Sequence, residues 1–171
     1  EIIVLGKNSP ARRPTMYDFL VYRRIDILNT ISRYNKQEPI TNKQLLFAPV
    51  KEFVQMPIEV KKMDAYSNTL KLYQSLLQSE IAAERTDAIL ISDLDRLEYA
   101  NNIIGLSQND SLYIQSLEQL SQQYSKNPYK VEILYKLAQY YYQGNYISSN
   151  RDPQKALDIC NNGIRQFPKY F

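Results

Sequence analysis

The sequence predicts an all-α fold made of antiparallel helix pairs. Only 4 of its 171 residues are glycine, so it has few positions for the tight turns that a barrel or a sandwich needs. Apolar residues recur at helical spacing along most of the chain, and only residues 2–5, where we expect an extended tail, could pair as a strand. Hydrophobic residues make up 44% and charged residues 23% of the chain, which is typical of a soluble globular protein.

The first helix is predicted over residues 14–34. Pro14 suits its opening turn, because the missing proline N–H would have no partner there in any case. The aliphatic stems of Arg23 and Arg24 bridge a gap in its apolar stripe. The stripe expected to pack inward consists of Met16, Leu20, Ile27, Ile31 and Tyr34.

Residues 35–63 are predicted to be an irregular connection. Three prolines interrupt helical hydrogen bonding there and bias the preceding residues toward extended backbone. They are Pro39, Pro49 and Pro57. One short helix is expected over residues 42–47, and we expect the connection to cover the edge of the neighbouring helix pair.

A helical hairpin is predicted to follow from residue 64. Its first helix ends near Glu84 and Arg85, and its stripe consists of Tyr66, Leu70, Tyr73, Leu77 and Ile81. Its second helix begins at Thr86 or Asp87, both good N-cap residues, and stops at Gly105. The stripe of that second helix consists of Leu90, Leu94, Leu97 and Ile104.

Three more helices are predicted in the last third of the chain. The first is capped by residues 109–111 and carries Tyr113, Leu117, Leu120 and Tyr124. Asn127 and Pro128 separate it from a helix that stops near Gly144. Asp152 as N-cap and Pro153 in the first helical position open the last helix, which runs to about Phe167.

The last two helices fit the tetratricopeptide repeat pattern of large, small and proline positions. The residues in register are Leu134, Leu137, Ala138, Tyr141, Ala156, Gly163 and Pro168. Pro128 and Pro168 are 40 residues apart, about six more than the ~34-residue repeat, and an insertion around residues 146–150 accounts for the difference. Cys160 stands where an aromatic residue is usual and is predicted to be a small core residue. The sequence thus predicts a tetratricopeptide-like right-handed α-α superhelix.

These patterns predict one continuous domain, residues 1–171, which has two parts. Residues 1–63 hold the N-terminal helix and the proline-interrupted connection, and residues 64–171 hold the tetratricopeptide-like helical pairs. Helix pairs of this kind must stack on a neighbour to bury their apolar faces. The first helix of each repeat then lines a concave side where protein segments bind.

A protein-binding face is predicted on the helix before Gly144. The residues expected on that face are Glu132, Tyr135, Lys136, Gln139 and Tyr142. The alternative is that the tyrosines at 140–142 serve core and inter-repeat packing.

The sequence offers no motif for catalysis, so we expect a non-enzymatic protein without a metal or another cofactor. It has no histidine and one cysteine, which leaves no material for a zinc site or a Cys-His pair. Asp93, Asp95 and Glu98 form an acidic group, but Leu94 and Leu97 are expected to face the core, so Asp93 and Asp95 should point outward to different sides. No phosphate-binding glycine loop occurs.

The charge and the hydropathy of the chain narrow the kinds of binding partner that we expect. The net charge of +3 carries no concentrated basic run, so we expect no nucleic-acid partner, and the doublets at 12–13 and 23–24 are interpreted as solvated helix surface. No apolar run reaches the ~18 to 20 residues that cross a membrane. The remaining expectation is a protein partner, or other domains of the same chain.

Two segments carry a resemblance to a known family. Residues 14–26, Pro-Thr-Met-Tyr-Asp-Phe-Leu-Val-Tyr-Arg-Arg-Ile-Asp, and residues 93–99, Asp-Leu-Asp-Arg-Leu-Glu-Tyr, resemble the N-terminal helical region of large alpha-2-macroglobulin family proteins of Bacteroides and related bacteria. The Asp-Pro-Gln-Lys-Ala-Leu run at 152–157 is consistent with that region. The thioester motif of some family members has no counterpart here, because Cys160 is followed by Asn-Asn-Gly.

The resemblance implies a scaffold or docking module of an envelope protease inhibitor, located in the periplasm or cell envelope. The chain starts without Met, and we expect it to be a segment of a longer protein. The alternative is a free-standing tetratricopeptide adaptor in envelope assembly or nutrient uptake, and the residues themselves leave a cytoplasmic location open.

Overall fold

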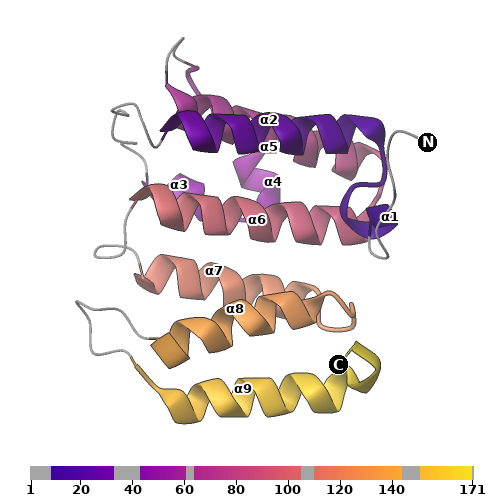
Figure 1. Cartoon of the computed structure of the whole chain (residues 1–171), viewed down its shortest axis with the longest axis vertical. Coiled ribbons are helices and arrows are strands. Elements are labelled where there is room, and N and C mark those ends of the chain that lie inside the picture. Colours follow the sequence, from indigo (N-terminus) through magenta and orange to yellow (C-terminus); the bar gives the residue numbers. More distant parts are fainter. Residues whose placement is uncertain (1–8, 33–42, 61–63, 105–109, 144–150, 171) are drawn as a thin grey trace. The chain divides into compact units, whose positions relative to one another are not determined.

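The computed structural model describes residues 9–32, 43–60, 64–104, 110–143 and 151–170. Every regular element within these ranges is a helix, which confirms the all-α prediction (Figure 1). The elements are α1 (Ser9–Arg12), α2 (Met16–Ser32), α3 (Lys43–Leu46), α4 (Val50–Phe53), α5 (Ala65–Ala82), α6 (Thr86–Ile104), α7 (Asp110–Gln123), α8 (Lys130–Gln143), α9 (Pro153–Gln166) and the 3-10 helix η1 (Pro168–Tyr170). The six long helices match the six predicted ones. The expected tail at 2–5 and insertion at 146–150 lie outside the described residues.

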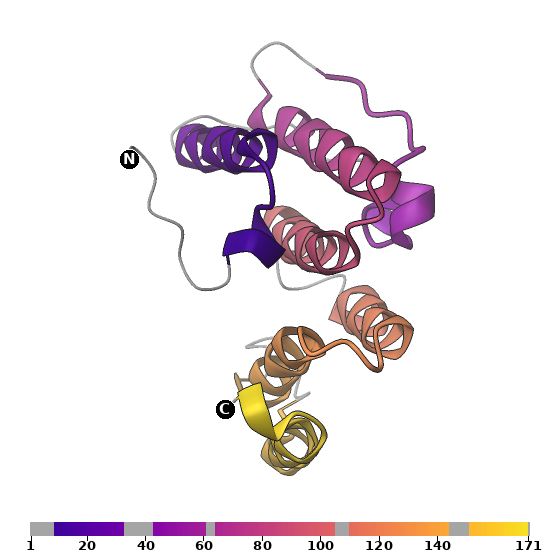
Figure 2. The same cartoon turned by 90° about the vertical axis from the view of Figure 1, so that its right-hand side faces the viewer.

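The chain forms two compact units, residues 1–96 and 97–171, and the division falls within α6. In the first unit α2 packs against α5, and the part of α6 that belongs to this unit lies beside them, as Figure 2 shows in a view along the helices. The shared core is rich in leucine, tyrosine and isoleucine from these three helices. Its fully buried members include Ile25, Leu70, Leu76, Leu77 and Leu90.

The predicted inward stripe of α2 is wrong. Met16, Leu20 and Ile27 are 57%, 58% and 57% exposed, and Ile31 is 40% exposed, while Tyr34 lies outside the described residues. The buried face is the opposite one, which consists of Asp18, Val21, Tyr22 and Ile25. The structure therefore buries the side of α2 that offers a carboxylate and a phenol. The turn between α5 and α6 provides a polar partner for the carboxylate, and α6 provides partners for the phenol.

The proline-interrupted connection contributes to the core in its described part, residues 43–60. It forms α3, where the short helix was predicted, and α4, which the sequence did not indicate. Its buried side chains are Leu46, Phe47, Val50 and Phe53. The amide of Gln74 on α5 donates 2.7 Å hydrogen bonds to the carbonyls of Phe53 and Met56. A long polar side chain thus provides the donors that an irregular backbone next to a core requires.

Two local motifs fix the ends of α5. Asp64 is its N-cap and accepts hydrogen bonds from the backbone N–H groups of Tyr66 and Ser67 at 3.2 and 3.0 Å. At the other end Glu84 has φ of 52°, and the Arg85 N–H donates to the Glu80 carbonyl at 3.0 Å. This bond pattern around a left-handed residue is a Schellman motif, and it turns the chain into α6.

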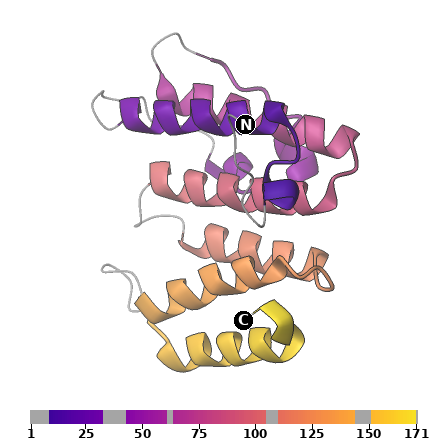
Figure 3. The same ribbon diagram turned by 45° about the vertical axis from the view of Figure 1, so that its right-hand side comes forward.

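In the second unit α8 packs against both α7 and α9, and these three helices follow one another in space (Figure 3). The predicted cap of α9 is confirmed, since Asp152 accepts a hydrogen bond from the Lys155 N–H at 2.9 Å and Pro153 stands in the first turn. At the end of α9 the Phe167 N–H bonds the Gly163 carbonyl, and Pro168 begins η1.

The repeat-framework residues other than Pro168 lie inside this unit. Leu134, Leu137, Ala138, Tyr141 and Ala156 are at most 9% exposed. Gly163 is buried as well, and a Cβ built on it would lie 3.3 Å from Leu134 Cδ1, so α8 and α9 approach closely at this point. Pro168 is exposed.

The prediction that Cys160 is a core residue is wrong. Its side chain is exposed and forms no disulfide. The same face of α9 also exposes Leu157 and Ile164, at 53% and 47%. The inward face of α9 is instead formed by the small residues Ala156 and Gly163.

Candidate functional site

The face of α8 predicted to bind protein segments combines exposed and partly buried side chains. At 100° of rotation per residue its five residues lie on one side of the helix. Tyr135 and Tyr142 are 61% and 59% exposed, whereas Glu132, Lys136 and Gln139 are partly buried. The opposite side packs Leu134 and its neighbours into the core. The structure thus leaves two aromatic rings in solvent, two helical turns apart, on an otherwise well-packed helix.

The neighbouring contacts order this face. Lys136 Nζ lies 2.6 Å from Glu98 Oε1, and the guanidinium of Arg151 stacks on the Tyr142 ring with 5.8 Å to its centroid. Tyr141 differs from Tyr142, because its ring is buried and its hydroxyl accepts a 2.7 Å hydrogen bond from Lys155. That bond raises the pKa of Lys155. The alternative of core packing therefore holds for Tyr141 and fails for Tyr142.

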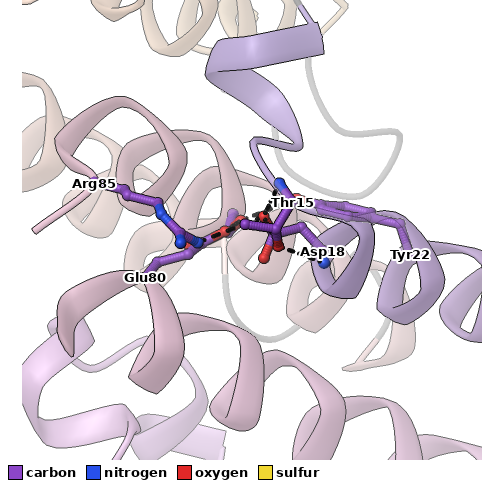
Figure 4. Close-up of polar contacts among 6 residues, drawn as sticks. Thr15, Asp18, Tyr22, Glu80 and Arg85 are labelled. Carbon is purple, nitrogen blue, oxygen red and sulfur yellow. Dashed lines mark hydrogen bonds and ion pairs between the residues drawn. The ribbon is translucent and has the colours of Figure 1, made fainter. Parts of the chain in front are cut away.

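A second group, which the sequence did not indicate as a cluster, lies inside the first unit (Figure 4). Thr15 and Asp18 form a capping box at the start of α2: the Asp18 N–H donates to Thr15 Oγ1 at 3.2 Å, and Asp18 Oδ2 accepts from the Thr15 N–H at 2.8 Å. Asp18 is fully buried and lies 3.7 Å from the Arg85 guanidinium. This carboxylate thus caps its own helix and pairs with the turn between α5 and α6.

Glu80 of α5 is the other buried carboxyl of this cluster. Its Oε1 lies 2.8 Å from Ser92 Oγ, which lies 3.1 Å from the Tyr22 hydroxyl, and that hydroxyl donates to Asp95 Oδ2 at 2.9 Å. These three contacts need three protons, but Ser92 and Tyr22 carry only one hydroxyl proton each. The third proton belongs to Glu80 or to Asp95, and we assign it to Glu80 because that carboxyl is fully buried whereas Asp95 is partly exposed.

Electrostatics favour the same protonation state. Burial raises the pKa of Glu80 to about 8, and the Asp18 and Asp95 carboxylates add to the increase, while Arg85 opposes it. Burial, together with Asp95, also raises the pKa of Tyr22. Glu80 is fully buried, so we interpret the cluster as a polar link between α2, α5 and α6.

The prediction that Asp93 points outward is wrong. Asp93 and Arg96 are 3% and 1% exposed, and Arg96 Nη2 and Nε lie 2.5 and 2.9 Å from Asp93 Oδ1. Arg96 also donates to the carbonyls of Leu46 and Ala48. Burial raises the pKa of Asp93, and Arg96 opposes that rise. Asp93 points inward because the irregular α3–α4 segment needs the donors of Arg96, and a buried Arg96 needs a counter-charge.

Sequence features could have revealed part of this network. The Thr-x-x-Asp spacing of residues 15 and 18 is typical of a capping box. Glu80 stands three residues after Leu77 on the apolar side of α5, where a charge is unusual. Nothing local indicates that Ser92 and Tyr22 meet, because they are 70 residues apart in the chain.

The described residues also bear on metal binding and on membrane insertion. Their His, Cys, Asp and Glu side chains form no group of three or more that could hold a metal ion. None of the described helices is both long and apolar enough to span a membrane.

Comparison with known proteins gives no match. No protein-family model fits the chain, and neither the curated proteins nor the solved structures contain one that matches it.

Proposed function

We propose that this chain is a non-catalytic helical repeat module that binds protein segments, with its binding face on α8. The observation that carries the proposal is the exposure of Tyr135 and Tyr142, at 61% and 59%, on a helix whose other side is packed. Tyrosine is enriched at protein interfaces, because its ring provides contact area and its hydroxyl a hydrogen bond. Lys136 and Gln139 supply polar groups between the two rings, and Glu132 supplies one a turn before Tyr135.

The proposal includes a tetratricopeptide-like arrangement of α8 and α9. It is supported by the burial of Leu134, Ala138 and Ala156 and by the close approach of the two helices at Gly163. In such repeats the first helix of each pair faces the ligand, which is the role assigned here to α8.

We test the binding face with displayed random peptides selected against the full chain. The retained peptides are measured against the double variant Tyr135→Ala/Tyr142→Ala. Loss of two central aromatic contacts should weaken binding about tenfold or more. The matched control is Tyr17→Ala, which removes a 45% exposed tyrosine from α2. Peptides that bind the double variant as tightly as the unaltered chain would refute the α8 face.

We further propose, from the resemblance of residues 14–26 and 93–99, that the module is part of a large envelope protein of the alpha-2-macroglobulin family. Its role there is scaffolding or docking in a protease inhibitor of Bacteroides or related bacteria. The complete reading frame tests this proposal. A secretion signal upstream and several β-sandwich domains downstream are expected, and a frame that lacks both would overturn it.

A further inference from the structure

The outward face of α2 carries a continuous apolar stripe. Met16, Leu20, Ile27 and Ile31 fall within an arc of about 60° at 100° per residue, and all four are between 40% and 58% exposed. The buried face of α2, centred on Ile25, lies on the opposite side of the helix. Isolated exposed apolar residues are normal on soluble proteins, whereas an aligned set marks an interaction surface.

Two arginines flank the middle of this stripe. Arg23 and Arg24 lie on either side of it, between Leu20 and Ile27, and both are exposed. Arg23 Nη1 lies 3.6 Å from Asp26 Oδ2, and the two side chains are 61% and 57% exposed. An exposed ion pair of this kind contributes little to stability. Arg23 can therefore leave Asp26 and pair with a carboxylate of a binding protein.

The stripe is symmetric about the midpoint between residues 23 and 24. Met16 and Ile31 are equally far from that midpoint, as are Leu20 and Ile27. A second copy packed antiparallel on α2 would match these apolar pairs, but it would bring four guanidinium groups together at the centre against only the two Asp26 carboxylates. Like charges at close range oppose association, so the geometry disfavours a second copy and calls for carboxylates at that point.

We propose that the α2 stripe is the docking site for an amphipathic helix of a protein partner that carries carboxylates midway along its apolar face. A stripe about 60° wide fits the narrow seam between two helices. Helices that lie in a membrane surface present a wider apolar face. This surface lies on a different helix from the α8 face, and the two proposals can fail independently.

The test uses three synthetic helical peptides as long as α2, 17 residues. Each carries leucine and isoleucine at the spacing of the α2 stripe; the first has two central glutamates, the second two lysines and the third two glutamines. Binding to the full chain is followed by fluorescence anisotropy of labelled peptide. We expect the glutamate peptide to bind about tenfold tighter than the lysine peptide.

Variants of the chain separate the two contributions. Leu20→Ser/Ile27→Ser should abolish binding, and Arg23→Glu/Arg24→Glu should reverse the preference toward the lysine peptide. The matched control is Leu157→Ser/Ile164→Ser, which removes two comparably exposed apolar residues from α9 and should leave binding unchanged. All substituted positions are exposed, and circular dichroism verifies that each variant folds.

Four outcomes would overturn the proposal. The first is equal affinity for all three peptides, and the second is no saturable binding up to about 1 mM peptide. The third is self-association of the chain that Leu20→Ser/Ile27→Ser removes, which would assign the stripe to a second copy. The fourth is binding to anionic phosphatidylserine vesicles that is stronger than to the glutamate peptide and is lost in the same variant, which would assign it to a lipid surface.

Discussion

Glu80 is fully buried between helices, and the geometry of its Ser92–Tyr22–Asp95 contacts matches a protonated carboxyl. Its pKa in the folded chain is about 8, whereas an unfolded glutamate has a pKa of about 4.3. The folded-state pKa is the higher one. The stabilisation associated with this proton is therefore fully present below about pH 4.3 and is lost as the pH rises toward 8.

We predict that Glu80→Gln stabilises the chain at pH 7 and above, by about 1 to 3 kcal/mol, and makes little difference near pH 4.5. Glutamine keeps the shape of the side chain and supplies a permanent donor to Ser92. Urea unfolding at pH 4.5, 7 and 8.5 measures the effect. Glu52→Gln, at an exposed position on α4, is the control. If Glu80→Gln destabilises equally at all three pH values, Glu80 is ionised in the folded chain.

Among the described residues other than glycine, Glu84 is the one with a positive φ. Its φ of 52° lies in the left-handed region, where glycine carries no steric penalty and is the usual occupant of a Schellman motif. We predict that Glu84→Gly stabilises the chain by about 0.5 to 1 kcal/mol. Thermal or chemical unfolding measures the change.

The neighbouring residue offers a matched control for that substitution. Ala83 has φ of −96°, a value that alanine adopts without strain. Glycine at this position would only increase the conformational entropy of the unfolded chain. Ala83→Gly should destabilise by about 0.5 to 1 kcal/mol. Equal effects of the two substitutions would show that the left-handed conformation at position 84 is not a source of strain.

At the scale of elements, α8 and α9 are held together through small residues. A Cβ on Gly163 would lie 3.3 Å from Leu134 Cδ1, closer than ordinary van der Waals contact, while alanine has a helix propensity about 1 kcal/mol better than glycine. We predict that Gly163→Ala changes the free energy of unfolding by less than about 0.5 kcal/mol, because the two effects offset each other.

A larger side chain at the same position has no such offset. Gly163→Leu should destabilise by about 1 to 3 kcal/mol through overpacking against α8. Asn162→Leu, one residue earlier at an exposed site of α9, is the control and should be close to neutral. If Gly163→Leu is tolerated as well as Asn162→Leu, α8 and α9 do not approach closely at this point.

The way α2 and α9 pack explains why each of them exposes an apolar face. The α2 stripe is exposed because the opposite face of α2 contains Asp18 and Tyr22. Asp18 pairs with Arg85 in the turn between α5 and α6, and Tyr22 bonds side chains of α6. The Leu157 and Ile164 side of α9 is exposed because α9 packs on α8 through Ala156 and Gly163. In both helices apolar periodicity identified a helix correctly but did not identify the side that is buried.

At the scale of the whole chain, the first unit depends on one buried cation. Arg96 pairs with Asp93, donates to the carbonyls of Leu46 and Ala48, and stacks on Phe53 with 4.4 Å to the ring centroid. It thereby joins α6 to a segment from the proline-interrupted connection. Removal of one partner from a buried pair leaves an unpaired charge in the interior.

We predict that Arg96→Ala destabilises the first unit by about 3 to 5 kcal/mol and accelerates hydrogen exchange at Phe53 and Val54. The amides of these residues bond the Pro49 and Val50 carbonyls in α4. Arg165→Ala, at an exposed site of α9, is the control. Unchanged protection of the α4 amides in Arg96→Ala would mean that Arg96 does not anchor this segment.

Local patterns in the sequence predicted the helical class, the six long helices and the cap at Asp152. These features are local, since a few neighbouring residues set the backbone angles and the first hydrogen bonds of each helix. The apolar spacing of α5 and α8 also predicted residues of their buried sides, because leucine and tyrosine dominate those sides.

Contacts between helices decide which face of α2 is buried and place Asp93 and Arg96 inside. The same contacts join Glu80, Ser92, Tyr22 and Asp95 in one hydrogen-bonded chain. The cost of burying a polar group depends on partners that are distant in sequence. A pattern of apolar residues contains no information about those partners. The same reason explains Cys160, whose exposure depends on which side of α9 meets α8.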